Sequence, residues 1–281
     1  VKLMTQKQFV HLPGGAALNK IKMIATDIDG TILKWDYQFS PEVKKCIKKM
    51  CERNIKVVLV TGRMHRAALG VSEELGLNTP IVSYQGALVK DNTGKTLYQK
   101  DLSPETACQI IKWAKDNNVH INLYMDDVLY VENDNETVRQ YTDARFIDYK
   151  VCKFDDLEIK NVNKILAIKY GDADTVTKWV KYLRKEYPEL YIVKSTPYFC
   201  EIADKQATKG LAVDFLCKQY GISKDEVLAI GDQDNDIELL KSGGIAVAMG
   251  NATEDLKKCA NFITDTVDND GWVKAIEKYC I

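Results

Sequence analysis

Short apolar runs that end on polar residues restrict the possible folds of this chain more than any other sequence feature. The first such run, residues 23–33, carries carboxylates at Asp27 and Asp29 before a Gly-Thr pair interrupts it. Strands of a parallel sheet that is covered on both faces are continuous apolar runs. Ligands of such sheets bind beyond the carboxyl ends of the strands. We therefore expect a buried strand that presents two acids at its tip; for this stretch alone, an acidic turn is the alternative.

The same pattern recurs in the first third of the chain and again near its end. Apolar runs at 55–60 and 80–83 precede Thr61 and Gln85, and further runs follow at 227–230, 245–248 and 261–264. Between the runs lie helical segments, such as one that begins at Ser40-Pro41, where Ser caps and Pro is tolerated. The alternation of strand and helix predicts an α/β core with a doubly wound parallel, Rossmann-like sheet.

The middle of the chain has a different texture. Between residues 88 and 204 strands outnumber helices, Asp126-Asp127 predicts a hairpin turn, and another strand is expected from Ile165 to Tyr170. We therefore expect an inserted α+β cap domain at 88–204 and a core made of 21–87 and 205–281. Residues 1–20 lack periodicity and are expected to form an extension outside the fold.

Composition excludes several classes of partner. Lys plus Arg number 39 and Asp plus Glu 40, so a net charge of -1 offers no general attraction to nucleic acid or to an anionic membrane. The chain has no apolar run long enough to span a membrane and no signal-peptide pattern. Eight cysteines without a C-x-x-C pair, and only 3 histidines, indicate a reduced, cytoplasmic protein without a zinc site. Monomer and homodimer remain equally open.

Polar residues at the predicted strand ends, and one at a helix start, suggest a common site. The carboxylates among them are Asp27, Asp29, Asp232 and Asp236. Carboxylates gathered in one crevice repel one another and need a cation. An all-oxygen set of ligands without His or Cys suits Mg²⁺ better than Zn²⁺. The sequence therefore predicts a magnesium site.

The remaining polar residues of this set suit a phosphate ester. The Thr61 hydroxyl and the Gly62 amide are suited to hold phosphate, and Lys209 to neutralise its charge. A carboxylate can act as the nucleophile in phosphoryl transfer, and an acid two residues away can protonate the leaving oxygen and then activate water. We therefore expect Asp27 and Asp29 to divide these two tasks.

These residues stand in four motifs that resemble those of the haloacid dehalogenase superfamily of phosphatases. The motifs are DIDGT at 27–31, VTGR at 60–63, KG at 209–210 and GDQDND at 231–236. The large insertion after the third strand and the ending DGWV at 270–273 resemble the Cof-type branch (type IIB, with a C2 cap). The likeness covers residues 21–280.

The resemblance implies a role for each carboxylate. Asp27 would be the nucleophile that forms an aspartyl-phosphate, with its other oxygen on Mg²⁺. Asp29 would be the general acid and base, with its backbone carbonyl on the metal. Asp232 would be a carboxylate ligand of the metal, and Asp236 would support the site without touching it.

The resemblance also implies which residues hold the phosphate. Thr61 and Gly62 would bind the transferring phosphoryl group, Lys209 would bind both phosphate and Asp27, and Asn235 would orient phosphate or Lys209. The chain departs from the family at Gln85, where Asn is common, so the family's substrate contact is not carried over there.

Four further polar residues have possible roles at the site. Arg63, Gln85 and Glu201 are candidates for contact with the substrate. His65 is expected on a helix surface, because surface is the usual place for polar helix positions.

Together these features predict an Mg²⁺-dependent phosphatase that acts on small phosphorylated metabolites, such as sugar phosphates. Two alternatives remain. A phosphosugar mutase of the same fold would return the phosphoryl group to the sugar. A non-catalytic protein would bind phosphate ligands without turnover.

Overall fold

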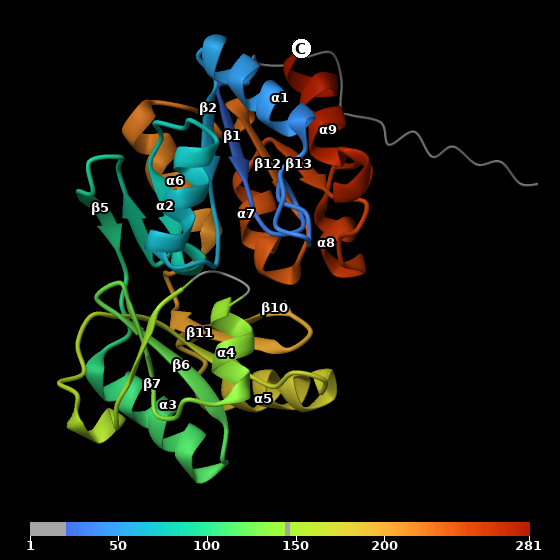
Figure 1. The fold of residues 1–281 in the computed structure, drawn as a ribbon. Helices are drawn as coiled ribbons and strands as arrows, with labels where there is room; N and C mark the ends of the chain where they lie inside the picture. Colours follow the sequence, from blue (N-terminus) through green and yellow to red (C-terminus); the bar gives the residue numbers. More distant parts are fainter. Residues whose placement is uncertain (1–20, 144–146) are drawn as a thin grey trace, which may run out of the picture.

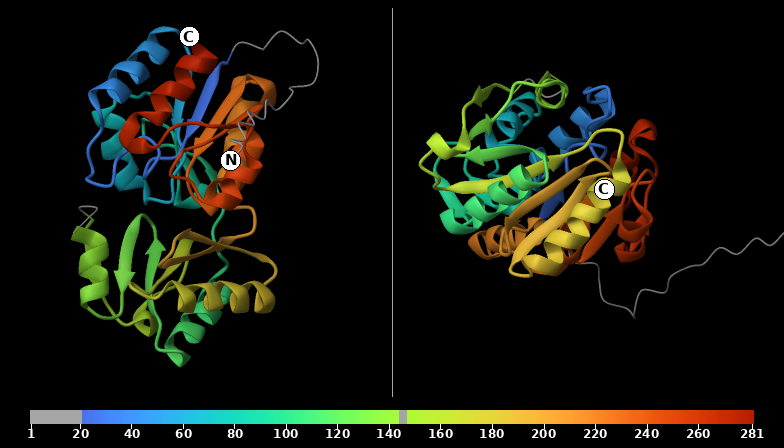
Figure 2. Two further views of the ribbon diagram at one scale, coloured as in Figure 1. Left: turned by 90° about the vertical axis from the view of Figure 1, so that its right-hand side faces the viewer. Right: turned by 90° about the horizontal axis from the view of Figure 1, so that it is seen from below.

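The computed structural model describes residues 21–143 and 147–281, so the predicted extension at 1–20 lies outside the described residues. The described chain forms two lobes, one above the other, and passes between them after β5 and after β11 (Figures 1 and 2). Within these residues, no helix combines the length and hydrophobicity needed to cross a membrane.

A five-stranded sheet forms the centre of the upper lobe, which we call the core (Figure 1). All of its neighbouring strands are parallel, in the order β14-β13-β12-β1-β2. The strands are β1 (Met23–Thr26), β2 (Lys56–Leu59), β12 (Val227–Gly231), β13 (Ile245–Ala248) and β14 (Phe262–Ile263). Every residue of β1 and β12 is buried, as expected for strands covered on both faces. The predicted doubly wound α/β core is confirmed.

Helices cover both faces of this sheet. Ile24 packs on the face that carries α1 and α9, and Ala25 on the face that carries α6 and part of α7. The helices of the core are α1 (Pro41–Glu52), α2 (His65–Glu74), α6 (Lys209–Tyr220), α7 (Ile237–Ser242), α8 (Glu254–Cys259) and α9 (Gly271–Cys280). The Ser40 hydroxyl caps α1 by accepting a hydrogen bond from the Val43 amide at 3.2 Å, so this helix begins where the sequence predicted.

The third predicted strand is present as β3 (Ile81–Ser83). It lies parallel to the end of β2, through a bridge between Val60 and Val82. It then pairs antiparallel with β4 (Leu88–Lys90), which pairs with β5 (Thr96–Gln99). The reason is the turn at 84–86, whose three residues have positive φ angles and reverse the chain at once. A parallel partner would need a long crossover connection.

A six-stranded sheet forms the lower lobe, which we call the cap (Figure 1). Its order is β10-β11-β9-β6-β7-β8, and only the β7–β8 pair is parallel. The strands are β6 (His120–Met125), β7 (Val128–Val131), β8 (Tyr149–Val151), β9 (Val162–Ile168), β10 (Leu190–Thr196) and β11 (Phe199–Asp204). Helices α3 (Pro104–Asp116) and α5 (Ala173–Glu186) cover the face away from the core. α4 (Glu136–Asp143) lies near the core.

The other face of the cap sheet packs toward the core. Leu166 and Phe199 belong to one buried cluster with Met64 and Tyr84 of the core. The predicted hairpin turn at Asp126-Asp127 is present between β6 and β7. This turn also joins the lobes, since the Tyr84 hydroxyl donates a hydrogen bond to Asp127 Oδ1 at 2.6 Å.

Candidate active site

Asp27 directly follows strand β1, where the sheet opens onto the cap. Lys209, the first residue of α6, donates a hydrogen bond to Asp27 Oδ1 at 2.5 Å and another to Asp236 Oδ1 at 2.6 Å. The Thr208 hydroxyl fixes the start of α6 by accepting a hydrogen bond from the Leu211 amide at 3.2 Å. The first strand and a helix start 182 residues later are thus joined through one buried ammonium group.

Asp232 stands beside Asp27 at the end of β12. Its Oδ1 accepts a hydrogen bond from the Thr31 hydroxyl at 3.3 Å, and its Oδ2 accepts one from Gln233 Nε2 at 3.0 Å. Gly30 has φ of +76°, and a side chain there would collide with this carboxylate. The glycine of the first motif therefore provides the room that Asp232 needs.

Asp236 organises the loop after β12. Its Oδ2 accepts hydrogen bonds from the amides of Asp232 at 2.9 Å and Gln233 at 3.1 Å, while its Oδ1 binds Lys209. Both oxygens are therefore used within the protein. Asp236 thus accepts three hydrogen bonds on its side chain, whereas Asp27 accepts one among the described residues, so Asp27 has the greater capacity for a further partner.

The charges at this point do not balance without another cation. Oxygens of Asp27, Asp232 and Asp236 lie within 4.8 Å of one another, and Lys209 supplies one positive charge against the three carboxylates. Burial, and then the neighbouring carboxylates, raise the pKa of Asp27 to about 7 and that of Asp232 well above its usual value. Such a buried all-oxygen cluster fits a hard divalent cation.

Lys209 keeps its proton in this environment. Burial works against the charged form, but Asp236 and Asp27 outweigh it and raise the pKa of the ammonium above its usual value. Lys209 is therefore a permanent positive charge beside Asp27.

Asp29 is held apart from this cluster by Arg63. The guanidinium donates Nε to Asp29 Oδ2 at 2.8 Å and Nη2 to Asp29 Oδ1 at 2.5 Å. Such a two-point contact fixes the plane of the carboxylate as well as its distance. The side chain of Asp29 remains about a third exposed, at 32%, so it faces the open part of the site.

The turn after β2 brings Thr61 and Gly62 to the same place. The Thr61 hydroxyl accepts a hydrogen bond from the Arg63 amide at 3.1 Å, which leaves its proton available for an acceptor such as a phosphate oxygen. A side chain at Gly62 would meet the side-chain amide of Gln85, which would then have to move. Asn235 Nδ2 donates to Gln85 Oε1 at 2.9 Å.

Two polar atoms of this amide pair have no partner among the described residues. They are the donor Gln85 Nε2 and the acceptor Asn235 Oδ1, and both are buried. Buried polar atoms are normally satisfied, so unpaired ones at a cavity indicate a place for a ligand or water. The structure joins Asn235 to Gln85; among the described contacts, it makes none to Lys209.

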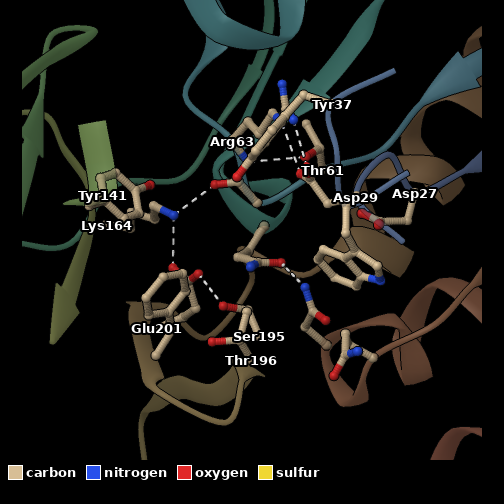
Figure 3. A pocket seen from close by; sticks show the side chains of 16 residues that line it. Asp27, Asp29, Tyr37, Thr61, Arg63, Tyr141, Lys164, Ser195, Thr196 and Glu201 are labelled. Atoms are coloured by element: carbon tan, nitrogen blue, oxygen red, sulfur yellow. Dashed lines mark hydrogen bonds and ion pairs between the residues drawn. The ribbon is translucent and has the colours of Figure 1, made fainter. Parts of the chain in front are cut away.

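A cavity that is partly open to solvent lies between the core and the cap. Figure 3 shows Asp27, Asp29, Thr61 and Arg63 on its core side. The other core residues that line it are Trp35, Tyr37, Gly62, Gln85, Gln233 and Asn235, and the cap contributes Tyr141, Lys164, Ser195, Thr196, Phe199 and Glu201. Three of the predicted site residues do not line the cavity themselves: Lys209, Asp232 and Asp236.

Glu201 was predicted near the ligand, and it lines the cavity, but its partners were missed. Lys164 Nζ donates to Glu201 Oε2 at 2.8 Å, and the Ser195 hydroxyl donates to Glu201 Oε1 at 2.6 Å. The predicted strand began at Ile165, whereas β9 begins at Val162 and includes Lys164. The sequence contains no signal for this pair, because a lysine at a strand start is usually exposed.

The prediction for His65 was wrong. This side chain is only 6% exposed, and its Nδ1 has no partner among the described residues. Burial lowers the pKa of the imidazole. His65 begins α2 directly after Met64, which packs against residues of the cap, and it does not line the cavity.

Comparisons with known proteins agree with this site. A family model described as haloacid dehalogenase-like hydrolase matches residues 24–276. The phosphatase YwpJ of Bacillus subtilis is 28% identical over 278 residues, which cover 89% of this chain and 97% of that protein. The 5-amino-6-(5-phospho-D-ribitylamino)uracil phosphatase YcsE of the same organism is 29% identical over 262 residues, or 93% of this chain and 96% of that protein.

Solved structures show the same relationship. A haloacid dehalogenase-like hydrolase from Bacteroides thetaiotaomicron is 28% identical and superposes with a TM-score of 0.81, covering 92% of this chain and 99% of that one. The family match spans both lobes and all four motifs. The chain therefore belongs to the haloacid dehalogenase-like hydrolases, in their Cof-type branch, and it is a phosphoric monoester hydrolase.

Proposed function

We propose that this phosphatase hydrolyses small phosphorylated metabolites, with Mg²⁺ and through an aspartyl-phosphate on Asp27. The observation that carries the proposal is the setting of Asp27 at the cavity. Lys209 holds Oδ1, whereas no described residue donates a hydrogen bond to Oδ2. One oxygen of Asp27 is thus fixed by Lys209, and the other is available to attack the phosphorus atom of a substrate. The name of the relative YcsE, a phosphatase of a small phosphorylated compound, supports the substrate class.

In the proposed reaction, Asp27 attacks phosphorus and the bond to the leaving oxygen breaks, while Asp29 donates a proton to that oxygen. Asp29 then removes a proton from a water molecule that attacks the phosphoryl group, which releases inorganic phosphate and restores Asp27. Arg63 keeps the Asp29 carboxylate in place through two hydrogen bonds.

The phosphoryl group would be held by the core alone. Thr61 can donate its hydroxyl proton, the Gly62 amide lies in the same turn, and the Gln85–Asn235 pair has an unpaired donor. Lys209 supplies positive charge from behind Asp27. These groups offer donors where negative charge is transferred, which is the main requirement for phosphoryl transfer.

Asp27 and Asp232, with the backbone carbonyl of Asp29, would hold Mg²⁺. When bound, the ion would offset the excess of carboxylates and neutralise phosphate oxygens. The buried all-oxygen donor set and the raised pKa values of Asp27 and Asp232 support this assignment.

The test is hydrolysis of a generic aryl phosphate by the purified protein with Mg²⁺. Asp27→Asn should lower kcat by about a thousandfold or more, because the nucleophile is lost. Asp268→Asn, the same change at an exposed core position, should leave kcat unchanged. Activity that survives Asp27→Asn would refute the mechanism, and isomerised sugar phosphate in place of free phosphate would favour a mutase.

We also propose that the inserted region is a separate cap domain, expected from the sequence at 88–204. The pairing of β4 and β5 with β3 supports a start after β5 instead, with the return to the core after β11.

All eight cysteines are free, which supports a reducing compartment such as the cytoplasm.

A further inference from the structure

The cap presents one buried ion pair to the cavity, between Lys164 of β9 and Glu201 of β11. Their side chains are 1% and 4% exposed, and the Nζ–Oε2 distance is 2.8 Å. Lys164 Nζ also donates to the Gly62 carbonyl of the core at 2.7 Å and lies 4.9 Å from the centre of the Tyr124 ring. The lysine is therefore fixed between the cap and the phosphate-binding turn (Figure 3).

Stability does not account for this pair. Removing two charges from water costs about as much as their attraction returns, and apolar replacements of similar size are often neutral or stabilising. The surrounding interface is apolar, with Leu166 and Phe199 as neighbours along the same strands. A charged pair at this place is therefore better explained by what it does to a ligand.

Glu201 retains capacity to accept hydrogen bonds. An ionised carboxylate has about four acceptor positions. Lys164 and Ser195 use two of them, one on each oxygen. The side chain lines the cavity, so the remaining positions are available to donors of a ligand. The two protein donors fix the carboxylate before a ligand arrives.

Taken over the described residues, the charges that line the cavity disfavour an anionic leaving group. Its cationic lining residues, within the part of the chain that the structure describes, are Arg63 and Lys164. Each is already paired with a carboxylate, Arg63 with Asp29 and Lys164 with Glu201. Among the described residues, each cation that lines the cavity is therefore already neutralised, and a second phosphate or a carboxylate on the leaving group would meet the negative charge of Glu201.

We propose that Glu201, held by Lys164 and Ser195, is a specificity-determining residue that accepts hydrogen bonds from hydroxyls of the leaving group. The preferred substrate class is then the monophosphate of an uncharged polyhydroxylated compound. Lys164 is a positioning residue, which orients Glu201 and ties it to the Gly62 turn. This inference rests on the proposed phosphatase function.

The test compares three phosphate monoesters of equal chain length: a hexitol phosphate, n-hexyl phosphate, and the phosphate of the matching aldonic acid. In the unaltered protein, kcat/KM for the hexitol phosphate should exceed the other two by about 10- to 100-fold, the contribution of one or two hydrogen bonds to a charged group. Equal rates for hexyl phosphate, or a preference for the aldonic-acid phosphate, would overturn the proposal.

Glu201→Gln supplies the second arm. It should lower kcat/KM for the hexitol phosphate and raise it for the aldonic-acid phosphate, because the carboxylate is gone and Lys164 becomes unpaired. A merely structural role would lower both together. The matched control is Glu189→Gln, the same change at an exposed cap position, which should preserve the unaltered ratio. The assignment would be refuted if the ratio of kcat/KM for the hexitol phosphate to kcat/KM for the aldonic-acid phosphate were the same in Glu201→Gln as in the control.

Two measurements separate failure of this inference from failure of the proposed function. Hydrolysis of the aryl phosphate reports the chemical step without any hydroxyl on the leaving group. If that reaction is absent, the proposed function fails, and calorimetric binding of the same three esters still tests Glu201. If Glu201→Gln does not fold by circular dichroism, the substrate comparison in the unaltered protein decides alone.

Discussion

The two lobes contribute to one cavity by different structural means. The core supplies Asp27 and Asp232 at the ends of adjacent parallel strands, and Lys209 at a helix start. The cap supplies Lys164 and Glu201 from within neighbouring antiparallel strands, where both side chains stand on one face of the sheet. The core groups are positioned by where backbone elements end, and the cap groups by which side chain occupies a sheet position.

This difference separates chemistry from specificity. Moving a core group would require the sheet to be rearranged, because strand ends are fixed by the parallel register. A cap group can change by a single substitution while the sheet remains intact. We therefore expect core substitutions to affect all substrates alike and cap substitutions to change the ranking of substrates.

The strongest test of the core is Lys209→Met. Loss of the ammonium leaves Asp27 and Asp236 buried without their shared partner, so the free energy of unfolding should fall by about 3–5 kcal/mol. Denaturant unfolding measures this loss, and kcat should fall for every ester alike. Lys218→Met, an exposed lysine on the same helix, is the control. If Lys209→Met is as stable as Lys218→Met, the ion pairs of Lys209 do not stabilise the core.

Binding of Mg²⁺ should stabilise the core, whereas Lys209→Met should destabilise it. Mg²⁺ at about one hundred times its dissociation constant should stabilise the folded protein by about 2.7 kcal/mol. A chelator should remove both the stabilisation and the activity. In Asp232→Asn the thermal shift on adding Mg²⁺ should shrink, because one of the proposed ligands is lost. An unchanged shift in that variant would exclude Asp232 as a ligand.

Arg63→Lys should have an intermediate effect. A lysine keeps the charge but cannot make the two parallel hydrogen bonds that orient Asp29. We expect kcat to fall about tenfold for all esters, with little change in thermal stability, since loss of one charge-assisted hydrogen bond corresponds to roughly that factor. A drop confined to one substrate would mean that Arg63 binds the leaving group instead.

The smallest effect should come from Ser195→Ala in the cap. This change removes one of the two donors that hold Glu201 but leaves Lys164 in place. The preference for the hexitol phosphate over hexyl phosphate should fall by about three- to tenfold, the net contribution of one hydrogen bond that orients Glu201. Aryl phosphate hydrolysis serves as the internal reference. A uniform loss on all esters would place Ser195 with the core chemistry.

The predictable part of the site consists of residues whose positions follow from strand ends. Asp27, Thr61 and Asp232 each follow a short apolar run, and parallel strands bring their carboxyl ends to one edge. The antiparallel pairing of β3 with β4 is not predictable in this way, because it depends on local positive φ angles at 84–86 that reverse the chain. Periodicity does not detect such a reversal.

The sequence by itself determined the α/β core and the four motifs, because both are encoded in segments of a few residues. Only the tertiary structure decided which cap side chains face the substrate. Lys164, Ser195 and Glu201 lie on three different strands, and Lys164 meets a backbone carbonyl 102 residues away. Contacts of this kind depend on how the two lobes pack, which no local pattern of residues specifies.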